Sequence, residues 1–453
     1  MHLLAARTGR AGARQFLRDE TREVDVAHVA REALRAAPCE PLRGKSVLLA
    51  LPRQLDTAIA LLRLAGVARR IVLWPSDVSP GHLGDVCDAA DIDEVLTELP
   101  WQDGGNVGAA ASDATAEAAV AATEWVLLTS GTTGRPKLVA HTLATLAGHL
   151  RNDAAPSGGP VWCTFYDIRR YGGLQILLRA LVGGGSLVLS GAHEAPAELL
   201  LRAGAAGATH FLGTPSHWRR VLMTGAAAAI APEYVRLSGE IVDQAILDRL
   251  RDAYPTARLV HAFASTEAGL GFEVADGMSG FPAALLDQAG NGVALRIEED
   301  RLRIRSSRVA LGYLQSRLIP VADADGFVDT GDVVALHDGR YQFAGRRDGT
   351  VNVGGQKVHP EEVEAVMNLH PAVQVSRVHA RSNPITGAVV VAEAVCRMAA
   401  MDTDQSDAAI GLLQAELRSF CRDRLPPHKI PAVIRIVPRL ELGASGKLAR
   451  QRA

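Results

Sequence analysis

An apolar run followed directly by a loop of hydroxyl and glycine residues is the feature that most constrains this chain. Residues 125–128 read Trp-Val-Leu-Leu, and residues 129–137 read Thr-Ser-Gly-Thr-Thr-Gly-Arg-Pro-Lys. The apolar run is typical of a buried strand. Glycine allows close approach of the backbone to a ligand, so N–H groups and hydroxyls in such a loop can point toward an anion. The pattern predicts a strand that ends in a phosphate-binding loop, and a nucleoside triphosphate is the expected anion.

This loop differs from the P-loop of kinases and GTPases. That motif requires glycine directly before the lysine and Ser or Thr directly after it, whereas Pro136 and Leu138 flank Lys137 here. A P-loop kinase is therefore disfavoured. Taken alone, a turn rich in Ser, Thr and Gly is more often an ordinary surface loop than a ligand site.

The whole string from Leu127 to Lys137 resembles the signature of the adenylate-forming superfamily. This superfamily includes acyl-CoA synthetases, aryl-CoA ligases, adenylation domains of peptide synthetases, and luciferases. Further motifs of the family follow in the same order, at residues 238–240, 263–267, 329–332, 345–348 and 445–447. Leu138 and Ala264 depart from the pattern, because glycine is usual at both places.

Length, charge and cysteine usage limit the class of protein. A chain of 453 residues is longer than one core usually supports, so at least two domains are expected. The net charge of −2 gives no reason to expect a nucleic-acid or membrane partner. Five scattered cysteines favour free thiols in a reducing cytosol. Because neither a signal peptide nor a membrane-spanning run is visible, we expect a cytoplasmic protein.

The order of apolar and turn segments predicts an α/β fold. Short apolar runs alternate with longer helical patterns, and buried strands are expected at residues 46–51, 70–74, 186–189, 209–212, 235–237 and 259–263. Alternating segments from 293 to 343 predict antiparallel β structure. We expect a large N-terminal domain, residues 1–347, with parallel α/β sheets and a small β-barrel-like part. A small α+β domain, residues 348–453, should follow, and the resemblance implies that it is mobile about a hinge at Asp348.

The resemblance assigns the phosphate loop and a metal ligand. Lys137 is the mobile positive partner of the phosphates, and the loop residues that hold them are Thr129, Ser130, Gly131, Thr132, Thr133 and Gly134. Thr266 and Glu267 match catalytic residues of the family, and Glu267 is also assigned to Mg²⁺, because carboxylate oxygens suit that cation. An isolated Thr-Glu pair would more often be a helix cap.

The resemblance also assigns the adenosine contacts. Phe263 replaces the frequent tyrosine and keeps the ring face that stacks on adenine; Ala264 and Ser265 belong to the same element. Asp332 is implied to accept hydrogen bonds from the ribose hydroxyls, and Arg346 to contact the ribose and phosphate region. Two residues are placed against the adenine edge, Gly239 and Glu240. Without the resemblance, Asp332 would be a turn residue and Arg346 a surface arginine.

Two C-terminal elements complete the implied chemistry. Lys447 matches the lysine whose ammonium bridges the substrate carboxylate and the α-phosphate while the mixed anhydride forms. The loop with Gly354, Gly355 and Lys357 resembles the segment that meets a pantetheine arm in the thioester-forming step. Read without the resemblance, Lys447 would be a solvated lysine and the glycine pair a tight β-turn.

The acyl pocket is expected at residues 166–174, 214–216 and 268–272, by analogy with the family. Within these ranges Arg169, Tyr171, Gly172 and Gly269 are the candidate substrate contacts. The cationic and phenolic groups of Arg169, Arg170 and Tyr171 favour a small aromatic or polar acid over a long alkyl chain. The predicted protein is an acid–thiol ligase that uses ATP and Mg²⁺ and passes the acyl group to coenzyme A or to the phosphopantetheine of a separate acyl carrier protein. Two alternatives remain: an acyl-AMP-dependent amide ligase and a non-catalytic nucleotide-binding sensor.

Overall fold

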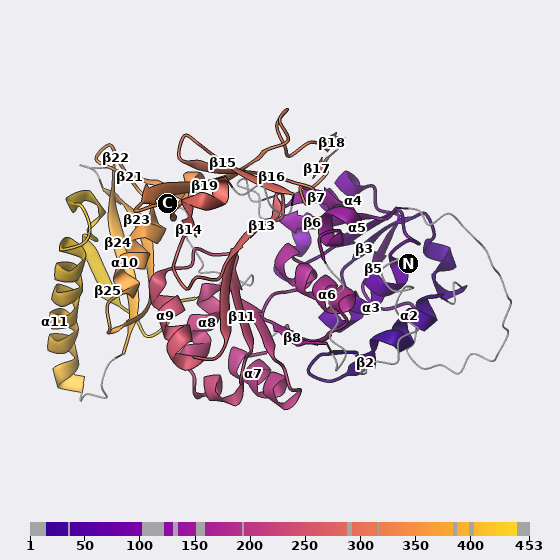
Figure 1. Cartoon of the computed structure of the whole chain (residues 1–453), viewed down its shortest axis with the longest axis horizontal. Coiled ribbons are helices and arrows are strands. Elements are labelled where there is room, and N and C mark those ends of the chain that lie inside the picture. Colours follow the sequence, from indigo (N-terminus) through magenta and orange to yellow (C-terminus); the bar gives the residue numbers. More distant parts are fainter. Residues whose placement is uncertain are drawn as a thin grey trace. The chain divides into compact units, whose positions relative to one another are not determined.

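The computed structural model describes residues 15–34, 37–101, 122–129, 135–150, 159–192, 194–287, 292–315, 317–383, 387–397 and 403–441. Figure 1 labels the helices and strands of the chain. The chain divides into two compact units. The first unit comprises Met1–Leu212, Ala264–Leu270 and Ser306–Gly326. The second unit comprises Gly213–Phe263, Gly271–Arg305 and Phe327–Ala453.

A seven-stranded sheet forms the part of the first unit that carries the predicted phosphate loop. Its order is β18-β17-β7-β6-β4-β3-β5. The strands are β3 (Ser46–Leu49), β4 (Arg70–Leu73), β5 (Glu94–Leu96), β6 (Glu124–Thr129), β7 (Lys137–His141), β17 (Gly312–Leu314) and β18 (Leu318–Ile319). Strands β5, β3, β4 and β6 run parallel to one another. Strand β7 pairs antiparallel with β6, β17 with β7, and β18 with β17. Strands β3, β4 and β6 are almost entirely buried, as their continuous apolar runs predict.

A second group of strands in the first unit is mostly parallel. Strand β1 (Phe16–Arg18) pairs with β9 (Ser186–Leu189), which pairs with β8 (Val161–Thr164), which pairs with β10 (His210–Gly213). Strand β2 (Glu23–Asp25) closes this group by antiparallel pairing with β1. Among the described residues, the α-helices of the first unit are α2 (Val26–Leu34), α3 (Gln54–Leu64), α4 (Leu83–Ala90), α5 (Leu143–Ala147), α6 (Tyr171–Gly183) and α7 (Pro196–Ala205).

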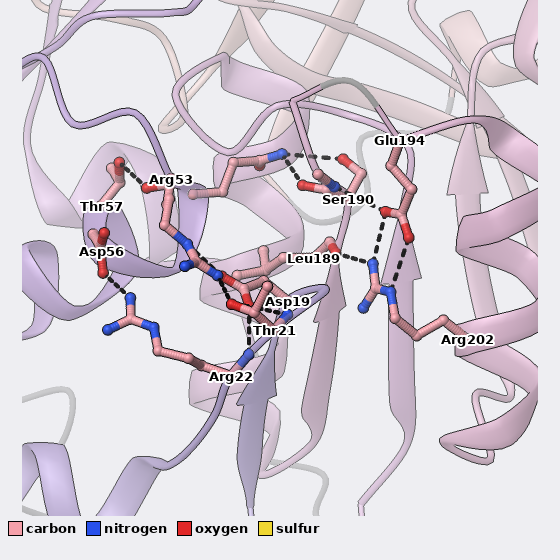
Figure 2. A network of polar contacts seen from close by, with 12 residues as sticks. Asp19, Thr21, Arg22, Arg53, Asp56, Thr57, Leu189, Ser190, Glu194 and Arg202 are labelled. Atoms are coloured by element: carbon pink, nitrogen blue, oxygen red, sulfur yellow. Dashed lines mark hydrogen bonds and ion pairs between the residues drawn. The ribbon is translucent and has the colours of Figure 1, made fainter.

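A polar network anchors the turn between β1 and β2 (Figure 2). Asp19 is 3% exposed and accepts hydrogen bonds from the N–H groups of Thr21 and Arg22 and from the guanidinium of Arg53, at 2.7 Å. Burial favours the neutral acid, but these donors together hold the pKa of Asp19 below its ordinary value. Arg22 also forms an ion pair with Asp56 of α3. The network thus fixes the hairpin to the start of α3.

The second unit begins with a helix and parallel strands. Its first elements are α8 (Pro215–Leu222), β11 (Tyr234–Ser238), α9 (Gln244–Ala253), β12 (Arg258–Ser265) and β13 (Gly269–Val274). Strands β11 and β12 run parallel, and β13 lies beside β12. A five-stranded sheet follows in the order β14-β20-β19-β16-β15. Its strands are β14 (Phe281–Pro282), β15 (Val293–Glu298), β16 (Arg301–Ser306), β19 (Val328–His337) and β20 (Arg340–Arg346). The antiparallel pairs of this sheet confirm the β structure predicted for residues 293–343.

The C-terminal residues form a small α+β domain with its own core. Its elements are β21 (Val351–Val353), β22 (Gln356–Val358), α10 (Pro360–Asn368), β23 (Val373–Asn383), β24 (Gly387–Cys396), α11 (Thr403–Arg422) and β25 (Val433–Ile436). The buried side chains of this core include Val363, Met367 and Val378. The predicted fold is confirmed: an α/β protein with a large N-terminal domain of mixed sheets and a smaller C-terminal domain. The boundary between residues 347 and 348 stays a prediction.

The strands expected from the apolar runs correspond to β3, β4, β9, β10, β11 and β12.

Among the described residues, no helix is both long enough and apolar enough to cross a membrane.

Candidate active site

The predicted phosphate loop connects two paired strands. Thr129, the last residue of β6, lies opposite Lys137, the first residue of β7, in an antiparallel pair. Residues directly opposite each other in such a pair point to the same face, so Thr129 and Lys137 share one face of the sheet. The assignment to phosphate stays a prediction for the whole loop. Its middle residues lie outside the described part of the chain: Ser130, Gly131, Thr132, Thr133 and Gly134.

Strand β17 extends this face of the sheet. It pairs antiparallel with β7, and Tyr313 lies opposite Val139. Val139 is two residues from Lys137 and therefore points to the same face. Lys137 Nζ lies 5.1 Å from the centroid of the Tyr313 ring, within the range of a cation–π interaction. Thr129, Lys137 and Tyr313 thus lie on one face of three adjacent strands.

Glu267, the predicted metal ligand, contacts the same tyrosine. The Tyr313 hydroxyl donates a hydrogen bond to Glu267 Oε1 at 3.1 Å. The N–H of Ala310 donates to the Glu267 carbonyl at 2.9 Å, and the N–H of the next residue donates to the carbonyl of Ala140 in β7 at 2.8 Å. The structure therefore brings the side chains of Lys137 and Glu267 into contact with the same residue, Tyr313.

A buried histidine holds the turn that carries Glu267. His141, the last residue of β7, is fully buried, and its Nε2 lies 2.8 Å from the carbonyl oxygen of Thr266. A carbonyl oxygen only accepts, so Nε2 carries the proton and Nδ1 accepts from the hydroxyl of Thr145, 3.0 Å away. Burial lowers the pKa of His141 to about 4, so the imidazole is neutral at pH 7. The predicted catalytic residue Thr266 is thus tied to β7 through its carbonyl.

Arg169, a predicted substrate contact, donates hydrogen bonds to acceptors within the protein. It is 3% exposed, its Nε lies 2.8 Å from the Asp167 carboxylate, and its Nη1 donates to the carbonyl of Leu51 at 2.7 Å. These partners compensate the burial of the charge. A contact between Arg169 and the acyl group stays a prediction.

The neighbouring Arg170 supports the end of β6. Its guanidinium donates to the carbonyl of Leu128 at 2.6 Å and to the Asp77 carboxylate at 2.6 Å. Leu128 directly precedes Thr129, so this arginine anchors the strand where the predicted phosphate loop begins.

The other predicted acyl contacts also lie in the first unit. Tyr171 is buried at the start of α6, and its ring centroid lies 5.8 Å from that of His141. Gly172 follows it in the helix. Gly269 has φ +75°, and a Cβ there would lie 2.7 Å from the Cβ of Arg308. Only glycine therefore fits at 269, but contact of these residues with an acid stays a prediction.

The second unit brings together the predicted ribose residues. Asp332 in β19 lies opposite Arg346 in β20, with 3.9 Å between Asp332 Oδ1 and Arg346 Nη1. Arg346 Nε also lies 3.3 Å from Oδ1 of Asp348, the predicted hinge residue. The guanidinium is 54% exposed and can offer further donors to a ligand. The roles in ribose binding and hinge motion stay predictions.

Phe263, the predicted adenine-stacking residue, belongs to a row of aromatic rings in the second unit. Its ring centroid lies 5.5 Å from that of Phe343, at 5° between the planes, and 5.7 Å from that of Phe272, at 18°. Ala264 packs against the core of the first unit, and Ser265 Oγ accepts the backbone N–H three residues later at 3.0 Å. The aromatic neighbours fix the plane of the Phe263 ring.

Glu240, predicted at the adenine edge, caps a helix in this structure. Both of its carboxylate oxygens accept hydrogen bonds from Ser216, one from the backbone N–H and one from the hydroxyl, each at 2.9 Å. Ser216 lies in the first turn of α8, where a negative charge is favourable. Gly239 precedes it with φ +85°. A nucleotide contact for both residues stays a prediction.

The glycine pair of the predicted thiol-substrate loop forms a two-residue hairpin turn. Gly354 has φ +58° and Gly355 φ +86°, and they connect β21 to β22, where Val353 pairs with Gln356. Positive φ at both positions is the property of a type I′ turn. Lys357 is exposed on β22. Lys447 lies outside the described residues, which end at residue 441.

Sequence analysis did not single out Tyr313 or His141. Tyr313 is 46 residues from Glu267, and no local pattern connects them. His141 could have been noticed, because it ends an apolar run, Leu-Val-Ala, and a polar group in a buried strand requires a partner.

Comparison with known proteins places the chain in a family. The AMP-binding enzyme family matches residues 43–314, and the AMP-binding enzyme C-terminal domain matches residues 362–447. The chain is 30% identical to the 2-succinylbenzoate–CoA ligase of Salmonella typhimurium over 253 residues, which cover 54% of this chain and 52% of that protein. It is 25% identical over 349 residues to a human mitochondrial acyl-coenzyme A synthetase, covering 72% of this chain and 59% of that protein. The chain thus spans about half the length of the curated relatives it matches.

Solved structures share the fold. A benzoate CoA ligase from Burkholderia xenovorans superposes with a TM-score of 0.78 at 20% identity, covering 99% of this chain and 97% of that one. An amide bond synthetase from Marinactinospora thermotolerans gives a TM-score of 0.73 at 18% identity, covering 96% of each chain. Since the family match extends over more than half of the sequence, this chain belongs to the AMP-binding enzymes.

Proposed function

We propose that this protein is an ATP-dependent, AMP-forming acid–thiol ligase. It converts a carboxylic acid to acyl-AMP with release of pyrophosphate and then transfers the acyl group to a thiol. The observation that carries the proposal is the placement of Thr129 opposite Lys137 and of both Lys137 and Glu267 against Tyr313 of β17, within the span that matches the AMP-binding enzymes.

In the first step, an oxygen of the substrate carboxylate attacks the α-phosphorus of ATP. The bond from that phosphorus to the oxygen bridging the α- and β-phosphates breaks, and pyrophosphate leaves with the electron pair. Negative charge develops on the phosphoryl oxygens, so fixed donors and cations stabilise the transition state. Thr129 offers a hydroxyl and Lys137 an ammonium from one face of the sheet, and Lys447 is proposed to add a second ammonium.

The residues present fit a magnesium ion bound together with the nucleotide. Mg²⁺ is usually held by one or two carboxylates and by substrate phosphates, not by a protein cage. Among the described residues, no three His, Cys, Asp or Glu side chains gather as a metal site. Glu267 would therefore hold the ion jointly with phosphate oxygens, and the ion would neutralise phosphate charge when bound.

In the second step, the sulfur of coenzyme A or of a carrier-protein phosphopantetheine attacks the acyl carbon, and AMP leaves. The Gly354-Gly355 turn is proposed to meet the pantetheine arm, because side-chain-free residues permit close approach. We propose that residues 1–347 and 348–453 act as separate domains about Asp348. Five free cysteines support action in a reducing compartment such as the cytoplasm.

The substrate is proposed to be a small aromatic acid or another small polar acid. Two of the proteins similar to this chain are named for 2-succinylbenzoate and benzoate, and both compounds are aromatic acids.

A panel of acids tests the proposal. Pyrophosphate release with ATP and Mg²⁺ should occur with at least one aromatic acid when hydroxylamine traps the acyl group, and thioester should form when coenzyme A or a carrier protein replaces it. Lys447→Ala should lower the rate of the first step by a factor of about 10²–10³, which is the usual loss when one group that stabilises transition-state charge is removed. Amide formation with amines but no thioester would favour an amide ligase. Nucleotide binding without turnover of any acid would favour a sensor.

A further inference from the structure

We infer that Tyr313 is a positioning residue that holds Glu267 and Lys137 in place and keeps these opposite charges apart. The inference rests on the proposed function, since it concerns how the same site binds Mg²⁺ and ATP. Tyr313 itself needs no contact with the substrate.

The backbone fixes the position of Tyr313 relative to both charged residues. Its strand pairs with β7 in a register that places Tyr313 opposite Val139, two residues from Lys137. The residue three positions before Tyr313, Ala310, bonds through its N–H to the Glu267 carbonyl at 2.9 Å. The segment that carries Tyr313 is therefore hydrogen-bonded both to the strand of Lys137 and to the turn of Glu267.

The hydroxyl of Tyr313 orients the Glu267 carboxylate. A phenol has one proton to donate, and it goes to Oε1, at 3.1 Å. Within the described part of the chain, this is the one side-chain hydrogen bond to that carboxylate. Oε2 is left to a cation, while the hydrogen bond restricts rotation of the carboxylate. Partners of this kind typically change metal affinity or activity 10–100-fold when they are removed.

The ring of Tyr313 does a separate task. It lies under the Lys137 ammonium, 5.1 Å from Nζ to the ring centroid. The described residues contain no ion pair between Lys137 and Glu267, although both contact the same tyrosine. An ion pair between them would neutralise the Lys137 charge that is proposed to bind phosphate. It would also occupy the Glu267 oxygens that are proposed to bind the metal. The aromatic ring thus binds the cation without neutralising it.

Two substitutions separate these tasks. Tyr313→Phe keeps the ring and removes the hydroxyl, so the Mg²⁺ concentration needed for half-maximal ATP binding should rise about 10–100-fold. ATP affinity measured without Mg²⁺ should stay within about twofold of wild type. Tyr313→Leu removes both features, so affinity for Mg²⁺-free ATP should also fall about two- to fivefold, the range for one exposed cation–π contact.

Isothermal titration calorimetry with ATP, at graded Mg²⁺ and with EDTA, measures both quantities. Tyr254→Phe is the matched control, because it removes a buried hydroxyl that donates to the Ala227 carbonyl at 2.8 Å in the second unit. It should leave the Mg²⁺ dependence unchanged. Melting temperatures within a few degrees of wild type would confirm that the Tyr313 variants fold.

An unchanged Mg²⁺ dependence in Tyr313→Phe would overturn the role of the hydroxyl. Equal Mg²⁺-free affinities in the two Tyr313 variants would overturn the role of the ring. Because binding is the readout, a wild-type protein that binds ATP but activates no acid would contradict the proposed function alone. A wild-type protein that binds no ATP would contradict both.

Discussion

His141 shows how surroundings set the protonation of one residue. Its ring is fully buried, its Nε2–H donates to the Thr266 carbonyl, and its Nδ1 accepts from Thr145. Protonation would put a charge in a dry environment and turn an acceptor nitrogen into a second donor. Burial therefore lowers the pKa of His141 to about 4, and the site is built for the neutral ring.

The lowered pKa of His141 predicts that the free energy of unfolding falls in acid. The pKa of histidine is 6.5 in the unfolded chain and about 4 for folded His141, so the stability from the neutral ring is complete above pH 6.5 and lost as pH falls toward 4. His141→Gln keeps an N–H donor without a titrating group. Between pH 7.5 and 4.5 wild type should lose about 2–3 kcal/mol more unfolding free energy than the variant.

Urea unfolding at both pH values measures this difference. Burial also lowers the pKa of His217 to about 4, but that residue is common to both proteins, so the comparison isolates His141. If wild type and His141→Gln lost the same unfolding free energy between the two pH values, the lowered pKa of His141 would be contradicted.

At the scale of elements, turns and strand pairings position the site. The β21–β22 hairpin depends on two residues with positive φ, and a Cβ added at Gly354 or Gly355 would meet no atom within 4 Å. Glycine is thus required there by backbone conformation and not by space. At Gly269 both reasons apply, because φ is +75° and a Cβ would lie 2.7 Å from the Arg308 side chain.

This contrast gives a prediction for asparagine, which tolerates the left-handed conformation. Gly355→Asn should change the unfolding free energy by less than about 0.5 kcal/mol, whereas Gly355→Val should cost about 1–2 kcal/mol. Gly269→Asn should destabilise despite its tolerant backbone, because the side chain has no room. Chemical denaturation of the three variants checks the order. A Gly269→Asn protein as stable as Gly355→Asn would show that the Arg308 contact relaxes.

At the largest scale, a buried polar network joins segments of the second unit that are far apart in the sequence. Asp243 caps α9 through the N–H of Ile246, forms an ion pair with Arg219 of α8, and accepts from Asn368 Nδ2 of α10 at 2.9 Å. Asn368 in turn accepts from the backbone N–H and the hydroxyl of Ser376 in β23, each at 3.0 Å. A single carboxylate thus connects three helices.

Removing that carboxylate should be costly. Asp243→Ala leaves the Arg219 charge buried without this partner and takes away a helix cap, so we expect a loss of about 3–5 kcal/mol. Arg219→Met in the same background should recover part of the loss, since it removes the uncompensated charge. Guanidinium denaturation of the single and double variants measures both effects. A double variant less stable than Asp243→Ala would contradict the explanation.

Much of the fold could be predicted from the sequence because its signals are local. Continuous apolar runs marked β3, β4 and β6, and the Gly354-Gly355 pair marked a tight turn, since glycine allows φ values that other residues avoid. The order of six motifs pointed to the family that the comparisons show. All of these properties depend on neighbouring residues or on motif order, so no knowledge of packing was needed.

The arrangement of the site was decided by tertiary structure. Tyr313 meets Glu267 across 46 residues of chain, and His141 meets Thr266 across 125. These contacts exist because β7 pairs with β17 and because the turn at Thr266 lies against both strands, and strand pairing over such distances leaves no periodic trace in the sequence. The sequence by itself determined which residue types are available for the chemistry; only the packed sheets decided which of them touch.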